Sequence, residues 1–308
     1  MGQARKHSDF WYHVAAFAMI LVWGISFLNT RVLLDAGLTP TEIFVARFTI
    51  AYLSLLVISR FKVRYTGWRD ELLFVVCGVA GGSAYFIAEN TALEYTLISD
   101  VAVLVSTAPL TTALMGAIFY RDERITWMTC LGMVIAFIGS VMLAMKNGLV
   151  WGDSITGDLL ALLAAFVWAF YSMALKRLNR TYTTLFITRK LFFYGILSAL
   201  PLLALEGNHL DWDVLGQPAV WGNLLYLGLI CSLAAYFIWG ITVKRIGAVR
   251  ASNYFYLSPI ISMISAAIWF GERTNAIAYI GCVLILGGVI IAEKFKRQPA
   301  ELDPGPTD

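Results

Sequence analysis

Apolar runs of about 20 residues follow one another along almost the whole chain, and this feature constrains the fold more than any other. A helix needs about 20 apolar residues to cross the hydrocarbon core of a bilayer, which is about 30 Å thick. In lipid every backbone polar group must be satisfied internally, and runs this long are typical of helices. Ten such runs are present, at 12–34, 41–60, 71–93, 97–120, 126–145, 156–176, 184–206, 220–242, 248–270 and 276–294.

The composition agrees with a chain that lies mostly in lipid. Of its 308 residues, 59% are hydrophobic and 14% are charged, and the mean hydropathy is +0.72. Soluble domains have about 45–50% apolar and about 25% charged residues, so an ordinary water-soluble enzyme and a disordered chain are both excluded. A net charge of +3 is too small to indicate a nucleic-acid partner. We expect an all-α integral membrane protein that contacts the lipid bilayer and has no soluble domain.

Lys and Arg residues in the connections between the runs indicate the orientation of the chain. With the N-terminus placed in the cytoplasm, the inner segments carry 17 of these residues and the outer segments carry 3. Cytoplasmic segments of membrane proteins carry such an excess. The first run is too long for a signal-peptide core, so we expect it to remain as a membrane helix. Because the number of runs is even, both termini are predicted to be cytoplasmic.

The second half of the sequence repeats elements of the first half. Pro109 and Pro259 interrupt the fourth and ninth runs, 150 residues apart. The tripeptide Ala-Tyr-Phe occurs at 84–86 and again at 235–237. Further matches in the same order pair Trp23 with Trp168, Arg47 with Arg189, and Glu123-Arg124 with Glu272-Arg273. Because a unit of five helices is odd, the second copy enters the membrane inverted, which is typical of transporters with a site between the halves.

We therefore predict ten transmembrane helices arranged as two inverted five-helix repeats. The first repeat is predicted at 1–148 and the second at 149–296, followed by a disordered cytoplasmic tail at 297–308, which is rich in Pro and Asp. Faces of small residues spaced by four favour close helix packing, and a homodimer interface is the alternative use. These small residues are Gly78 and Gly82 in the third run, and Gly132, Ala136 and Ser140 in the fifth.

Four ionisable side chains fall inside the predicted spans, where charge is expensive and usually functional. Glu89 lies in the third run, and its counterpart in the second repeat is Gly240, so it is not part of a symmetric scaffold. It is a candidate to bind a cationic amine or to carry a proton. The alternatives are a structural pair with Arg47 and a group that is wetted near the outer surface. Arg47, Arg189 and Lys190 are expected to extend toward lipid head groups or to cap helix carbonyls.

Several aromatic side chains lie deeper in the runs than the interfacial belts that many membrane aromatics form, although a belt position is the alternative for any one of them. Trp23 and Trp168, like Tyr85 and Tyr236, recur in both repeats and are candidates to line a central cavity. Aromatic walls suit flat or apolar ligands and make cation–π contacts with amines. Further cavity candidates are Asn90, Tyr171, Trp239, Asn253 and Tyr256.

The two mid-run prolines are candidates for a role in gating. Pro109 and Pro259 each remove a backbone hydrogen bond and kink a helix. Hydroxyl groups at Ser106, Thr107 and Ser258 are placed to satisfy the freed carbonyl groups. A point that flexes during gating and a fixed kink that shapes the bundle are both consistent with this pattern.

The sequence contains no catalytic or cofactor motif of the common types. It has no Gly-x-x-x-x-Gly-Lys-Ser/Thr loop, no His-Glu-x-x-His motif and no Gly-x-Ser-x-Gly elbow. The four cysteines lie in apolar runs without a Cys-x-x-Cys pair, so we expect them to be small core residues. The chain is predicted not to be an enzyme, to bind no metal and to need no cofactor.

Short motifs spread along the chain carry a family resemblance. They are WGISF at 23–27, ENTALEYT at 89–96, STAP at 106–109, DER at 122–124, KRIGAVRAS at 244–252, LSP at 257–259 and GER at 271–273. On these motifs the chain resembles the drug/metabolite transporter superfamily and, within it, the EamA-type transporters, which include bacterial aromatic amino-acid exporters. The resemblance implies a 5+5 helix fold around a central cavity, alternating access, and export of small metabolites through the bacterial cytoplasmic (inner) membrane.

The sequence therefore favours a secondary transporter that exports small organic metabolites, such as amino acids or amines, by alternating access. A sugar-phosphate or nucleotide-sugar exchanger is an alternative, although Arg47 and Arg189 are predicted at opposite depths and do not converge. A lipid or polyprenyl-phosphate flippase is another alternative, and it would require a lateral opening with a basic pocket. An intramembrane enzyme would need a nucleophile–base or metal constellation, and none is evident in the sequence.

Overall fold

The computed structural model describes residues 2–59, 65–96, 98–119, 126–144, 155–206, 214, 216–270 and 276–294. In this part of the chain every regular element is a helix, and no strand is present. The predicted tail at 297–308 lies outside the described residues, and so do the two predicted Glu-Arg pairs, Glu123-Arg124 and Glu272-Arg273.

Helices occupy each of the predicted apolar runs. In the first half they are α1 (Gly2–Asp35), α2 (Pro40–Ile58), α3 (Trp68–Gly78), the π-helical segment η1 (Val79–Ser83), α4 (Ala84–Tyr95), α5 (Ile98–Val105), α6 (Ala108–Phe119) and α7 (Trp127–Ala144). In the second half they are α8 (Ile155–Leu178), α9 (Thr184–Glu206), α11 (Pro218–Leu225), the π-helical segment η3 (Tyr226–Ala234), α12 (Ala235–Ile246), α13 (Ala248–Ser252), the 3₁₀ turn η4 (Asn253–Leu257), α14 (Ser258–Phe270) and α15 (Ala276–Lys294).

Within the described residues, seven helical stretches are long and apolar enough to cross a membrane. They are Phe10–Asp35, Pro40–Ile58, Trp68–Tyr95, Asp100–Phe119, Ile155–Leu178, Thr184–Glu206 and Pro218–Ile246. Two shorter apolar helices, Trp127–Met142 and Tyr279–Ala292, lie within α7 and α15. Stretches of this length and composition are typical of a multi-pass membrane protein.

The start of α2 follows directly from its sequence. Gly37 takes a positive φ of 99°, which costs glycine little, and turns the chain after α1. Thr39 caps α2 by accepting from the Glu42 backbone N–H, and the Glu42 carboxylate accepts from the Thr39 N–H at 2.8 Å. Pro40 occupies the first turn, where its missing N–H costs nothing.

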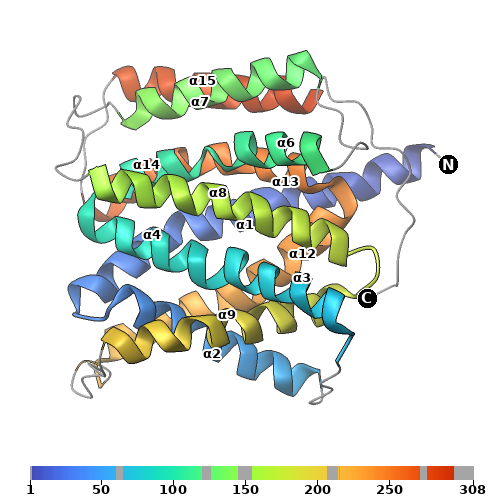
Figure 1. Cartoon of the computed structure of the whole chain (residues 1–308). Coiled ribbons are helices and arrows are strands. Elements are labelled where there is room, and N and C mark those ends of the chain that lie inside the picture. The colour runs from blue at the N-terminus through green and yellow to red at the C-terminus, as the bar shows by residue number, and fades with distance from the viewer. Residues whose placement is uncertain are drawn as a thin grey trace.

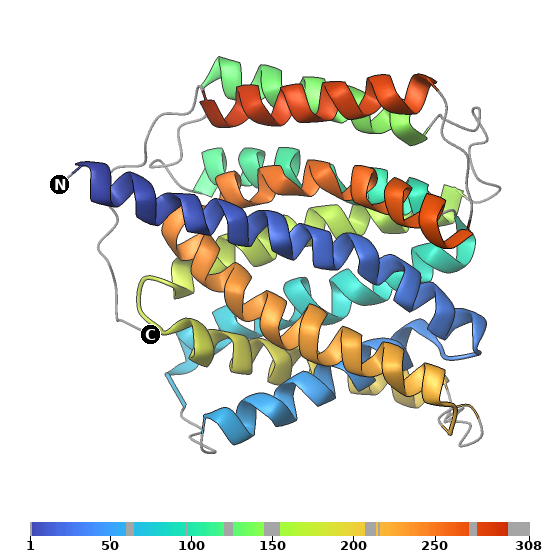
Figure 2. The same ribbon diagram turned by 180° about the vertical axis from the view of Figure 1, so that it is seen from behind.

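The helices form a layered bundle in which elements of the two halves alternate (Figures 1 and 2). The pair α7 and α15 forms one outer layer, and α2 and α9 lie at the opposite side of the bundle. Between them, α8 packs against both α4 and α6, and α1 packs against α12 and α14. Every layer therefore brings together helices from both halves of the chain, so the core belongs to the two halves jointly.

Glycines hold α7 and α15 together at backbone distance. A Cβ atom added to Gly132 would lie 2.5 Å from the Ala292 backbone nitrogen, and one added to Gly288 would lie 2.5 Å from the Gly132 carbonyl oxygen. The small-residue face predicted at 132–140 is thus packed against α15 of the same chain. Cys130, on the same helix, is exposed, so the prediction that all four cysteines are core residues is wrong at this position.

The internal repeat has a structural counterpart that the sequence patterns did not predict. The segments η1 and η3 are both π-helical, and each directly precedes one copy of the Ala-Tyr-Phe tripeptide, at 84–86 and at 235–237. A π-helical turn leaves carbonyl groups outside the regular α-helical pattern and is frequent at functional sites. The two halves therefore place the same irregularity at the same point.

The predicted interruptions near the two prolines are also present. Between α5 and α6 the chain makes a turn at Ser106 and Thr107, whose hydroxyl groups donate to the Val103 and Leu104 carbonyls at 2.6 and 2.7 Å. Pro259 cannot donate to the Phe255 carbonyl, which accepts instead from the Ser258 backbone N–H at the end of η4. The hydroxyl at Ser258 is not needed for this purpose.

Candidate functional site

A small pocket lies where helices of both halves converge. Its lining comes from α1, α4, α5, α8, η4 and α14. The lining residues are Ile20, Trp23, Ser26, Phe27, Tyr85, Phe86, Glu89, Val105, Trp168, Phe255 and Ser258. Four of the predicted cavity residues, Trp23, Tyr85, Glu89 and Trp168, are thus brought together.

Aromatic rings form most of the pocket wall. The Trp23 and Trp168 rings, predicted to be repeat counterparts, meet edge to face with centroids 5.6 Å apart. Tyr85 lies 5.0 Å from Trp168, and Phe255 lies 5.1 Å from Trp168, also by ring centroids. The indole nitrogen of Trp168 is a buried donor without an acceptor in the described structure. The surface that lines the pocket is therefore mostly apolar, with a few polar atoms at fixed positions.

Glu89 is the carboxylate of this pocket. It is 7% exposed and accepts a hydrogen bond from the Tyr85 hydroxyl at 2.7 Å, one helical turn away on α4. Glu89 and Arg47 do not contact each other directly: Glu89 accepts from Tyr85, and the Arg47 Nε donates to Ser232. A buried carboxylate without a cation in ion-pair contact is a candidate to bind a ligand.

Arg47 lies behind the pocket wall. Its side chain is 1% exposed, its Nε donates to the Ser232 hydroxyl at 3.0 Å, and its guanidinium carbon lies 4.2 Å from the centroid of the Phe86 ring. The expectation that Arg47 extends toward lipid head groups is wrong, because the guanidinium points into the bundle. Arg189 is also buried and donates to the Ser59 hydroxyl at 3.2 Å, at the end of α2.

Three further predicted residues form a second layer around the pocket rings. The Trp239 ring lies 5.2 Å from Trp23, and the Tyr171 ring lies 4.8 Å from Trp168, by centroids. The Tyr236 hydroxyl donates to the Gly81 carbonyl of η1 at 2.5 Å. None of the three lines the pocket, because Trp23, Trp168 and Phe86 stand in front of them.

The π-helical segments each receive a hydrogen bond from an aromatic side chain of the other half. Tyr236, in the second half, donates to Gly81 in η1, and the Trp23 indole, in the first half, donates to the Cys231 carbonyl of η3 at 2.9 Å. The irregular carbonyls are thus satisfied across the boundary between the halves, and the Trp23 ring is held in the pocket wall.

Asn90, Asn253 and Tyr256, also predicted as cavity residues, are buried but do not line this pocket. Asn90 points toward α2 and donates to the Pro40 carbonyl at 3.2 Å. The other two lie in η4, whose 3₁₀ winding changes which side chains face inward. Phe255, between them, lines the pocket instead, and neither it nor Phe86 was predicted.

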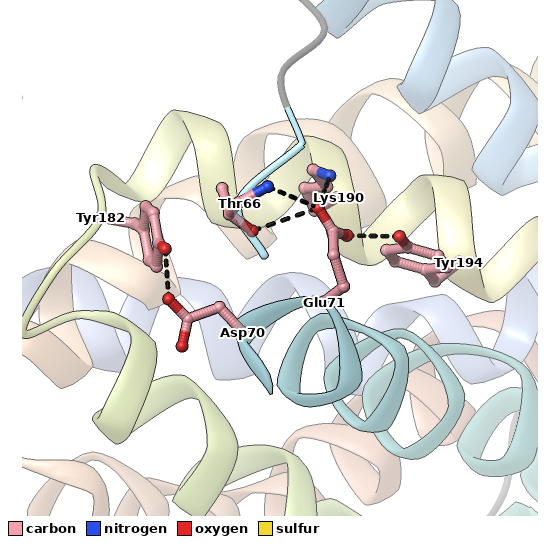
Figure 3. Close-up of polar contacts among 6 residues, drawn as sticks. All are labelled: Thr66, Asp70, Glu71, Tyr182, Lys190 and Tyr194. Carbon is pink, nitrogen blue, oxygen red and sulfur yellow. Dashed lines mark hydrogen bonds and ion pairs between the residues drawn. The ribbon is translucent and has the colours of Figure 1, made fainter. Parts of the chain in front are cut away.

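A polar cluster lies near the start of α3, away from the pocket residues (Figure 3). The Lys190 ammonium group on α9 contacts a Glu71 carboxylate oxygen at 2.6 Å, and the Tyr194 hydroxyl donates to the other oxygen. The backbone and hydroxyl of Thr66 also donate to Glu71, at 3.0 and 3.1 Å. Lys190 is therefore an ion-paired residue, and its ammonium group lies at the end of the span where Glu71 begins α3.

The carboxylates of this cluster were missed because Asp70 and Glu71 stand at the edge of an apolar run, where charges are ordinary. The Tyr182 hydroxyl, in the connection between α8 and α9, donates to Asp70 at 2.5 Å (Figure 3). Burial and this hydrogen bond raise the pKa of Tyr182 above its ordinary value. The only available sequence signal was the intramembrane Lys190, which calls for a carboxylate partner.

Two copies of one family model cover most of the chain. The model of the EamA-like transporter family matches residues 10–145 and again residues 155–293. The chain belongs to the EamA-like transporter family. It is therefore a multi-pass membrane transporter built from a duplicated unit.

Across the part of the chain that the structure describes, no group of three or more His, Cys, Asp or Glu side chains is arranged to hold a metal ion.

Relatives of this EamA-family chain include proteins named as exporters. A probable terminal-alkyne amino-acid exporter of Streptantibioticus cattleyicolor is 28% identical over 284 residues, covering 91% of this chain and 93% of the relative. A probable amino-acid metabolite efflux pump of Salmonella typhimurium is 26% identical over 285 residues, covering 90% and 92%. A crystal structure with 20% sequence identity superimposes with a TM-score of 0.71 over 92% of this chain and 98% of the other, which shows the same fold.

Proposed function

We propose that this EamA-family transporter is a secondary transporter that exports small organic metabolites, amino acids or amines, by alternating access. The observation that carries the proposal is the pocket around Glu89, where one buried carboxylate without a cation partner is enclosed by aromatic rings from both repeats. The names of the two exporter relatives support the same class of substrate.

The proposed architecture has ten transmembrane helices in two inverted repeats, at 1–148 and 149–296, with both termini in the cytoplasm of a bacterium and the spans in its inner membrane. The matched positions of η1 and η3, and of the two proline interruptions, support the repeat. The excess of Lys and Arg in the connections that become cytoplasmic supports the orientation.

In the proposed mechanism Glu89 binds the ammonium group of the solute, and the Tyr85 hydroxyl holds the carboxylate in position. The rings of Trp23, Trp168 and Phe255 cover the apolar part of the solute and add cation–π attraction. When no solute is bound, a proton on Glu89 removes the uncompensated charge, which couples solute and proton movement in opposite directions.

Gating is assigned to the interrupted helices that border the pocket. Val105 lies at the end of α5, just before the turn that precedes Pro109, and Ser258 begins α14, just before Pro259. Bending at these points changes the pocket lining directly, because both residues belong to it.

Phosphate-bearing substrates fit this arrangement less well. A sugar phosphate or a polyprenyl phosphate needs several cations that converge on one point. Here Arg47 lies behind Phe86, Arg189 is beside Ser59, and Lys190 is paired with Glu71. No basic side chain is among the pocket-lining residues that the structure describes, so an exchanger of sugar phosphates and a flippase are not favoured.

The test is uptake into proteoliposomes that contain only this protein. Labelled amino acids, amines, nucleosides and sugar phosphates are offered, with and without a pH gradient. Saturable uptake of amino acids or amines, stimulated by a gradient that drives protons outward across the vesicle membrane, is the expected result. Uptake of sugar phosphates alone, or transfer of a fluorescent lipid between leaflets without movement of any solute, would replace the proposal with one of the other functions.

A further inference from the structure

Arg47 is the most buried cationic side chain in the described part of the chain, and no described carboxylate lies within ion-pair distance of it. Its Nε donates to Ser232, but its Nη2 has no hydrogen-bond partner, and no described carboxylate pairs with it. A buried guanidinium without a counter-charge is costly, and such residues inside a membrane usually have a function.

A single aromatic ring separates this guanidinium from the pocket. The Arg47 guanidinium carbon lies 4.2 Å from the centroid of the Phe86 ring, and Phe86 itself lines the pocket. Glu89 stands three residues further along α4, on the same face of the helix, and also lines the pocket. A carboxyl group and a guanidinium group thus lie beside one side chain, and neither has a partner within ion-pair distance.

We propose that Arg47 is a specificity-determining residue that binds the carboxylate of a zwitterionic solute when the Phe86 side chain turns to another rotamer. Glu89 holds the ammonium group of the same solute. The inference rests on the proposed export of amino acids or amines, and it selects between them. A small α-amino acid supplies both missing counter-charges, whereas a simple amine supplies one.

The repeat provides a matched control within the same chain. Arg189 is the predicted counterpart of Arg47, and it also donates to a serine hydroxyl and lies near a phenylalanine, Phe186, at 5.2 Å. Its surroundings differ, because the counterpart of Glu89 is Gly240 and Arg189 does not border the pocket. Any effect that depends on the pocket must therefore appear at Arg47 and not at Arg189.

The experiment uses the proteoliposomes described above and measures uptake of the labelled amino acid or amine that they transport. L-phenylalanine, L-leucine and L-threonine are compared with their amides as inhibitors of that uptake. An amide keeps the ammonium group and the side chain and removes the carboxylate. The wild-type chain is expected to prefer the amino acid over its amide by about tenfold, because a charge-assisted pair is lost. Arg47→Gln is expected to bring that ratio close to one while inhibition by the amide stays unchanged, and Arg189→Gln is expected to keep the wild-type ratio.

Phe86→Leu tests the separating ring without altering Arg47. A smaller side chain opens the path to the guanidinium, so the preference for the amino acid over its amide is expected to rise. This variant and the wild-type ratio decide the matter even if Arg47→Gln does not fold.

Equal inhibition by amino acids and amides in the wild type would overturn the inference, and so would an equal loss of both in Arg47→Gln. Transport of amines with no effect of any amino acid would leave the proposed export intact and remove the role of Arg47. If no solute moves at all, the proposed function itself fails.

Discussion

Glu71 and Glu89 stand 18 residues apart in one helical stretch, Trp68–Tyr95, and both are 7% exposed, yet their surroundings are opposite. Glu71 is paired with Lys190 and accepts further hydrogen bonds from Tyr194 and Thr66 (Figure 3). Glu89 accepts from Tyr85 and faces a pocket. Burial alone does not separate a structural carboxylate from a functional one; the number of its partners does.

The largest effect is expected from removing one partner of the Glu71–Lys190 ion pair. Glu71→Leu leaves the Lys190 ammonium buried without its partner, and Lys190→Met leaves Glu71 in the same state. Each is expected to cost about 3 kcal/mol of stability, measured as loss of monodisperse protein after heating in detergent.

The double variant Glu71→Leu with Lys190→Met is expected to recover much of that stability, since it buries neither charge alone. The matched control is Asp35→Asn, which breaks the exposed Arg31–Asp35 pair, whose side chains are 41% and 60% exposed, and should change little. Stability equal to wild type in both single variants would show that the cluster is not structural.

The second effect concerns Glu89 and is expected in transport and not in stability. Glu89→Gln keeps the size of the side chain and removes its charge, so uptake should fall about tenfold or more, because a hydrogen bond to a charged group contributes about 1.5–3 kcal/mol. The response to a pH gradient should disappear with it, while the melting temperature in detergent stays that of the wild type.

Glu94→Gln is the control for this variant, because Glu94 lies on the same helix and is exposed. A Glu89→Gln chain that transports normally, with an unchanged response to pH, would assign Glu89 to the same structural class as Glu71.

A smaller effect is expected at the aromatic wall. Trp168→Ala should reduce transport several-fold while expression and membrane insertion survive, because the ring contacts Trp23, Tyr85 and Phe255 across the pocket. Trp127→Ala, at a position that is 69% exposed, should leave both properties unchanged. Normal transport by Trp168→Ala would make Trp168 a packing residue.

The smallest effect is expected at the second layer. Tyr236→Phe removes the hydroxyl that donates to the Gly81 carbonyl of η1 and leaves the ring in place. One hydrogen bond is worth about 1 kcal/mol net, so the melting temperature should fall slightly and substrate selectivity should not change. A change of selectivity would place Tyr236 with the pocket residues.

The same comparison explains how much of the molecule the sequence could predict. The helices follow from the length of the apolar runs, and the α2 capping box follows from Thr39 and Glu42, because both signals are local. Depth and recurrence selected Trp23, Tyr85 and Trp168, and an intramembrane charge selected Glu89; all four line one pocket.

The misses arise where the helix departs from its regular period. The π-helical segments and the 3₁₀ turn η4 change which side chains face inward, so Phe255 takes the place expected for Asn253 and Tyr256. The partner of Lys190 was missed for a different reason, since Glu71 is distant in sequence and lies at the edge of a run. The number of spans and their orientation stay predictions. The roles of the site residues are predictions that the experiments above test.

The contact between α7 and α15 has a mechanical consequence for the proposed alternating access. A Cβ atom on Gly132 or Gly288 would meet backbone atoms at 2.5 Å, so backbone packs directly against backbone at these positions. Close backbone packing of this kind couples the two helices tightly. We expect them to move as one rigid body while the remaining helices rearrange, so that a crosslink between them would leave the working cycle intact.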